Sequence, residues 1–272
     1  MIQISKIIVN PVKVDKIQVK WIFKPTFENF NDYVFRLERS ESPESAFVPI
    51  FRFTDAMQYL DVINYRRLWK TIYYRIRITH IATGKEEISD PAQFEYAPNL
   101  EALEIIRRND ILLKNKRHGI GVPVVVFLRK QDGPRCNCWD PDKKRVRVSN
   151  CEECYQTGYA HGFYDPIVTW ANMSPDNKAA PLPQWGETET NDTRIFLSNY
   201  PEVEPKDVII EPRLLRVWMV ENVETSQRRG HLLHQLVTMS YLDRNSVLYK
   251  LLERHPNLPD LIEAQQKRIE LS

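Results

Sequence analysis

The sequence predicts a mainly β, multidomain protein, and three observations lead to this fold class. Apolar residues alternate with charged ones through roughly the first hundred residues, which is the period-two pattern of half-buried strands. All four cysteines fall within one window of nineteen residues, and short apolar stretches bounded by proline or glycine return after it. We therefore expect a β-sandwich at 1–97, a linking helix at 98–118, a zinc-binding hairpin module at 119–165, and a β-rich connector region with terminal helices at 166–272.

Composition and charge argue against several classes of protein. Hydrophobic residues make up 42% of the 272 residues and charged residues 27%, which are ordinary globular values and disfavour wholesale disorder. The 38 Lys and Arg against 36 Asp and Glu leave a net charge of +2, so broad electrostatic binding to nucleic acid or acidic membranes is not favoured. No apolar run reaches the roughly 18 residues of a membrane helix, and the first residues lack the pattern of a secretory signal. We expect no membrane partner and synthesis in a cytoplasm.

The segment 1–97 has the pattern of about seven short antiparallel strands, a number that fits two packed sheets. Turn-prone stretches at 40–43 and 83–85 separate the alternating runs. The clearest runs are Ile17-Val19-Trp21, Tyr33-Phe35-Leu37 and Ile72-Tyr74-Ile76-Ile78.

The same segment resembles a fibronectin type III domain over about a third of the chain. Leu68 stands six residues before Tyr74, as do the leucine and tyrosine of that family's corner, and Trp21 matches its core tryptophan. The resemblance implies a sandwich in which Trp21 and Tyr74 pack in the core, and such domains are usually spacers or adhesion modules. The matching residues are Leu68 to Ile78, Gly84, Ser89-Asp90-Pro91, Val19-Lys20-Trp21 and Pro25.

A helix is predicted after Pro98. Asn99 can cap it, and Leu100, Leu103, Ile106 and Leu113 follow with rough helical spacing. The basic run 114–117 is either a solvated helix end that suits the helix dipole or a phosphate contact. A short apolar strand is expected at 122–128.

The cysteines form two tight pairs, C-x-C and C-x2-C, separated by twelve residues. A tetrahedral thiolate site needs this arrangement, because each pair supplies two sulfurs and a hairpin between them, with its proline turn at 140–142, brings the pairs together. Two disulfides or free thiols are the alternative, which the absence of a secretion signal disfavours. We expect a structural zinc ion whose closed shell excludes a catalytic water. The ligands are Cys136, Cys138, Cys151 and Cys154, and His118 and His161 flank them as possible replacements.

The string C-x2-C-x-x-T-G-Y at 151–159 resembles a zinc knuckle, in which backbone amides after the second cysteine turn back toward the thiolate. It also resembles the cysteine repeats of J-domain cochaperones. Only one repeat-like half is present and there is no J domain, so no chaperone function is inferred.

Strand-like stretches return at 193–198, 207–210, 214–223 and 232–242, and the last two predict a long hairpin that turns at Gly230. Helices are expected at 247–254 and from Pro259 to Leu271. Two segments, Asn172 to Asn191 and Pro256 to Ser272, are expected to become ordered against neighbouring subunits. An ordinary mobile loop and a self-packed C-terminal helix are the alternative.

Several phrases from Gly119 onward resemble the small β-barrel neck proteins of tailed bacteriophages and uncharacterised phage virion proteins. The resemblance implies a structural protein of the virion, assembled in the host cytoplasm, that acts as a neck (head–tail connector) component. Its partners would be other copies in a ring and the neck, portal or tail subunits; a baseplate or other tail protein is the alternative. The matching phrases are Asp207-Val208-Ile209, Leu215-Arg216-Val217, Arg228-Arg229-Gly230, Asp243 to Tyr249, C-x-C-W-D-P and G-x-Y-D-P-I.

No catalytic set competes with this interpretation, and we expect no enzyme. His231 and His234 form H-x-x-H without H-E-x-x-H, a strand would point their rings apart, and the sequence has neither G-x-S-x-G nor a glycine-rich phosphate loop. A nucleic-acid-binding zinc module remains an alternative, because basic residues surround the cysteines, although a hydrated hairpin would also account for them. These are Arg129, Lys130, Arg135, Lys143, Lys144, Arg145 and Arg147.

Overall fold

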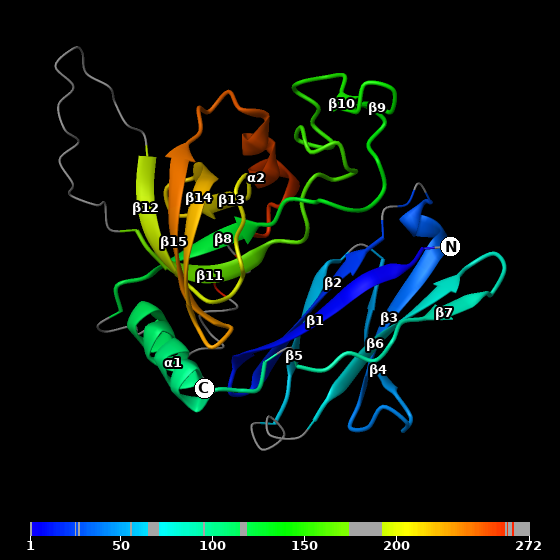
Figure 1. The fold of residues 1–272 in the computed structure, drawn as a ribbon. Coiled ribbons are helices and arrows are strands. Elements are labelled where there is room, and N and C mark those ends of the chain that lie inside the picture. The colour runs from blue at the N-terminus through cyan, green and yellow to red at the C-terminus, as the bar shows by residue number, and fades with distance from the viewer. Residues whose placement is uncertain are drawn as a thin grey trace, which may run out of the picture.

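The computed structural model is mainly β, with an N-terminal pair of sheets beside a C-terminal barrel (Figure 1). Helix α1 lies at the end of the barrel nearest β1, and the cysteine-bearing loops project from the opposite end. No helix within the described residues is long and apolar enough to cross a membrane. The structure describes residues 2–24, 26, 28–54, 56–64, 71–94, 96–114, 119–173, 192–258, 260 and 263.

The N-terminal strands form two antiparallel sheets, as the period-two pattern predicts. One sheet has the order β1-β2-β5 and the other the order β4-β3-β6-β7. A short 3-10 helix, η1 (Phe30–Asp32), precedes β3. The strands are β1 (Ile4–Lys13), β2 (Lys16–Phe23), β3 (Tyr33–Ser40), β4 (Val48–Phe53), β5 (Gln58–Val62), β6 (Tyr73–His80) and β7 (Glu86–Ile88).

The two sheets share one core. Trp21 of β2 stacks on Phe53 of β4 with ring centroids 4.4 Å apart, and its indole nitrogen donates to the carbonyl of Ala56. Tyr74 is fully buried, and its hydroxyl donates to Asp61 Oδ2 at 2.8 Å. The prediction that Trp21 and Tyr74 are core residues is confirmed. Leu68 and Pro25, which also carried the fibronectin resemblance, lie outside the described residues.

Helix α1 (Leu100–Lys114) links the two parts. Its first turn is capped as predicted, because the N–H groups of Glu101 and Ala102 donate to Asn99 Oδ1 at 3.0 and 3.1 Å. Ala102, Leu103 and Ile106 extend the core of the two sheets onto the helix. The expected continuation through residues 115–118 is outside the described part of the chain.

Six antiparallel strands close into a barrel in the order β11-β12-β15-β14-β13-β8. Strand β8, which the sequence groups with the cysteine module, pairs with both β11 and β13. Its run of Val124 to Phe127 is fully buried on both faces, and this explains why no alternation is visible there. The strands are β8 (Val122–Phe127), β11 (Ile167–Asn172), β12 (Asp192–Ser198), β13 (Val208–Glu211), β14 (Arg216–Arg228) and β15 (His231–Tyr241).

The predicted long hairpin is confirmed as β14–β15. Arg229 and Gly230 turn it with positive φ angles of 49° and 81°, the conformation of a tight two-residue turn. The tip reaches back to the linker before α1 and to the first turn of α1: a Cβ at Gly230 would lie 2.5 Å from the Tyr96 ring of the linker, and Arg228 pairs with Glu101 of α1 at 2.7 Å.

After β15 the chain turns helical, as predicted for 247–254. A 3-10 helix, η3 (Val247–Tyr249), is capped by the Ser246 hydroxyl and runs into α2 (Lys250–Arg254). Most of the helix expected from Pro259 to Leu271, and residues 174–191 of the segment after Asn172, lie outside the described residues.

Candidate metal centre

The cysteine module is an excursion between two neighbouring barrel strands, β8 and β11. Its two limbs stay antiparallel, because Arg129 bridges to Phe163 and Arg135 bridges to Tyr159. Backbone N–H groups of Lys130 and Ala160 cross between the limbs, to the carbonyls of Gly162 and Pro134 at 3.0 and 2.9 Å. The barrel therefore fixes both ends of the inserted segment. The paired limbs bring the two cysteine pairs close to each other.

A small hairpin joins the two cysteine pairs, as the spacing predicts. Strands β9 (Trp139–Asp140) and β10 (Arg145–Val146) pair antiparallel. The turn between them is fixed by Asp140, whose Oδ1 accepts the N–H groups of Asp142 and Lys143 at 3.1 and 3.3 Å.

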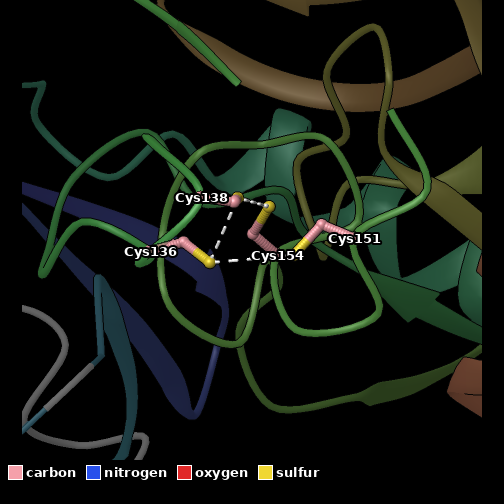
Figure 2. Close-up of side chains that lie close together, drawn as sticks. All are labelled: Cys136, Cys138, Cys151 and Cys154. Carbon is pink, nitrogen blue, oxygen red and sulfur yellow. Dashed lines mark hydrogen bonds between the residues drawn. The ribbon is translucent and has the colours of Figure 1, made fainter. Parts of the chain in front are cut away.

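The four cysteine sulfurs converge on one point, as Figure 2 shows. All four lie within 4.8 Å of one another, and they form the only such metal-binding group in the part of the chain that the structure describes. Cys138 Sγ lies 3.3 Å from Cys136 Sγ and 3.3 Å from Cys154 Sγ, and Cys136 Sγ lies 3.8 Å from Cys151 Sγ. A disulfide requires about 2.05 Å, so these are four free thiols gathered into a set of ligand atoms for a metal ion.

Local contacts make the four sulfurs chemically unequal. Burial raises the pKa of Cys136 to about 11 and also raises the pKa of Cys138. Burial acts on Cys151 as well, but the backbone N–H groups of Cys154 and Glu153 outweigh it and lower the pKa of Cys151 to about 7. These amides follow the first cysteine of the pair, whereas the zinc-knuckle resemblance predicted amides after the second. The backbone thus stabilises the thiolate of Cys151, while burial disfavours the thiolates of Cys136 and Cys138.

Residues around the cysteines hold the loops in place. The Arg135 guanidinium lies 4.1 Å from the ring centroids of both Trp139 and Tyr159. Gly158, at φ 79°, passes so close to this stack that a Cβ would lie 2.7 Å from the Trp139 ring. Thr157 Oγ1 donates to the carbonyl of Cys154 at 2.7 Å. The T-G-Y string is therefore explained by packing around the cysteines. Its glycine was the one residue from which the sequence could have indicated this close approach.

The flanking histidines do not join the cysteines in the described structure. His161 is exposed, with a positive φ of 65°, and is not part of the metal-binding group. His118 lies outside the described residues. A carboxylate also lies beside the cysteines, with an oxygen of Glu153 3.6 Å from Cys136 Sγ.

The other sequence candidates do not assemble into a site. His231 and His234 sit three residues apart on β15, so they point to opposite faces of the strand. His231 is buried with its Nε2 3.0 Å from the carbonyl oxygen of Ala97, whereas His234 packs on the Phe196 ring and burial lowers its pKa.

The basic residues near the cysteines do not form one free surface. Lys130 is only 3% exposed and donates to the carbonyl of Ala160, and Arg135 is held in the aromatic stack. Arg147 lies 3.4 Å from the carboxylate of Asp140. Of the seven cations, Lys130 is therefore buried, while Arg135 and Arg147 are exposed but contact other side chains of the module.

No family model matches this chain, and no curated protein matches it in sequence. The fold and the cysteine cluster therefore carry the functional argument.

Proposed function

We propose that this chain is a structural protein of a tailed-bacteriophage virion, a neck component whose copies form a ring between head and tail. The observation that carries the proposal is the closed barrel. Three phrases that resemble neck proteins fall on β13, on the start of β14 and on the β14–β15 turn, and all three elements belong to this barrel. A closed barrel has no free sheet edge, so neighbouring copies would meet through hairpins and loops rather than by strand pairing.

The N-terminal sheets support the proposal as a spacer. Seven strands in sheets of three and four, around a core containing Trp21 and Tyr74, are consistent with the fibronectin type III resemblance. In this proposal the domain sets distance and adhesion between subunits, and it has no reaction centre.

The metal in this proposal is zinc. Four sulfurs at about 2.3 Å from a tetrahedral zinc ion are about 3.8 Å from one another, and three of the six pairs here lie at 3.3, 3.3 and 3.8 Å. Iron also accepts four tetrahedral thiolates, and elemental analysis distinguishes the two metals. Four protein ligands leave no open position, so the ion stabilises structure and the chain is not an enzyme.

The cysteine module buries too few apolar side chains to be stable without further bonds, such as those to a metal ion. Apart from Cys136 and Cys154, the buried hydrophobic residues between 129 and 164 are Tyr155 and Phe163. A segment with so few buried apolar side chains cannot offset its conformational entropy by packing alone. Metal–thiolate bonds would supply the missing stabilisation.

Purified particles of the phage that encodes this chain test the proposal directly. Mass spectrometry should detect the chain in the particles, and a density map should place the barrel and the paired sheets in the neck. Absence of the chain from complete particles would refute a virion role. A position in the baseplate would keep the virion role and refute the neck.

A further inference from the structure

The junction where the β1–β2 turn, α1 and β11 meet contains two cavities that the proposed function does not use. Their volumes are about 450 and about 300 Å³. Four residues line both cavities, so the shared wall brings three ammonium groups and one carboxylate together. These residues are Lys13, Lys16, Asp110 and Lys114.

The one carboxylate shared by both cavities, that of Asp110, forms ion pairs with two of the three lysines. Asp110 forms ion pairs with Lys13 and with Lys114, the latter at 3.2 Å, and its other oxygen accepts the Ser198 hydroxyl at 2.8 Å. The side chains of this pair of lysines are only 25% and 23% exposed, and that of Asp110 is 12% exposed. Within the described residues, Lys16 has no ion pair at all.

The remaining charges leave at least one positive charge unmatched when all three lysines are charged. Asp15 adds a carboxylate to the larger cavity, and Arg107, which also lines it, shares the carboxylate of Glu104 with Arg108 at 2.7 and 2.9 Å. Burial and the neighbouring Lys114 together lower the pKa of Lys13 to about 7, so the charged form of this lysine is disfavoured in the absence of an anion. A bound anion would stabilise the charged form of Lys13 and would give the half-buried Lys16 a partner.

The walls beside this charged group are apolar. Val14, Leu103, Ile106 and Ile111 line the larger cavity. Its volume falls within the range of about 300–1,000 Å³ of small-molecule sites, which occur preferentially where domains meet. The site therefore offers a cationic end and an apolar wall to the same ligand.

We propose that this junction binds an alkyl carboxylate, with its carboxylate between Lys13, Lys16 and Lys114 and its chain along Leu103, Ile106 and Ile111. The ammonium groups fit the charged end of such a ligand and the apolar wall fits its chain, whereas phosphate has no chain to bury. The proposal is independent of a virion role.

Calorimetric titration of the full chain with octanoate tests the site. Three probes separate the contributions: octylammonium has the same chain with the opposite charge, acetate has the charge without the chain, and inorganic phosphate is the dianion. Octanoate should bind saturably and at least about tenfold more tightly than each of the three. Absence of saturable octanoate binding, or equal binding of octylammonium, overturns the proposal.

Two substitutions locate the binding. Lys16→Met leaves the Lys13–Asp110–Lys114 pairs intact and should weaken octanoate binding by about tenfold or more. Ile111→Glu places a negative charge on the wall of the larger cavity, at a residue that is 46% exposed and so tolerates the change, and it should weaken binding similarly. Lys85→Met, an exposed lysine next to the β6–β7 turn, is the matched control and should bind as the unaltered chain does. Equal affinities of Lys16→Met and Lys85→Met would refute this location.

Discussion

The buried hydroxyl of Tyr74 provides a sharp test of the N-terminal fold. It donates to Asp61 Oδ2 at 2.8 Å, and the same carboxylate receives Arg39 Nη1 at 2.7 and 3.0 Å. Tyr74→Phe removes one donor to a charged acceptor and leaves the ring in place. Because hydrogen bonds to charged groups are worth about 1.5–3 kcal/mol, and Asp61 keeps Arg39, we expect a loss near the lower end, about 1.5–2 kcal/mol.

Hydrogen exchange followed by mass spectrometry measures this loss within one part of the chain. The protein has several domains, so a single global unfolding transition would not assign the effect. The opening free energies of the slowest amides in β2, β3 and β6 should fall together, while those of the barrel strands stay unchanged.

The adjacent Tyr73 supplies the control. Tyr73 is only partly buried on the opposite face of β6, so Tyr73→Phe should change the opening free energies by less than about 0.5 kcal/mol. If Tyr74→Phe and Tyr73→Phe gave the same small effect, the buried bond to Asp61 would not stabilise the two sheets and the reasoning would fail.

Four further predictions concern the module and its surface. Elemental analysis should find about one zinc per chain, and finding no zinc with four reactive thiols would remove the assignment. Cys151→Ser should open the amides of 129–164 to exchange and leave β1 to β7 protected, whereas His161→Ala should alter neither. Gly158→Ala should weaken zinc binding through collision with Trp139; Gly84→Ala, with the same sign of φ and nothing within 4 Å of its Cβ, should not. The logarithm of DNA affinity should not vary with the logarithm of salt concentration, and a steep negative slope would favour the nucleic-acid alternative.

Local patterns predicted much of this structure. Residues 74, 76 and 78 alternate with charged residues because one face of β6 meets the core. Asn99 caps α1 because its side-chain oxygen accepts the N–H group of Glu101, only two residues along the chain. The spacing of the cysteines also predicted that their sulfurs converge, because the two cysteines of each pair are close in sequence and share one turn. Such features depend on residues close in sequence, where stereochemistry leaves few options.

Closure of the barrel could not be predicted in this way. Strand β8 pairs with residues 167–171 and 208–210, and its uninterrupted apolar run is equally compatible with several sheets. The ion pair of Lys13 with Asp110 joins residues 97 positions apart, and neither residue has a local signal. The Arg135 stack was likewise invisible, because its aromatic partners come from both limbs of the module.

Polar contacts join the three parts of the molecule, and this bears on a role in assembly. Asp207, before β13, accepts the N–H of Arg129 at the base of the module and the N–H of Glu204, each at 2.7 Å. Glu204 in turn lies 3.4 Å from Lys20 of β2. Elsewhere the β14–β15 tip lies against Tyr96 of the linker and pairs with Glu101 of α1. Movement of the paired sheets relative to the barrel would break the Lys20–Glu204 ion pair, and movement of α1 would break the contacts of the hairpin tip. In the proposed neck role, a subunit braced in this way would hold its neighbours at a constant spacing.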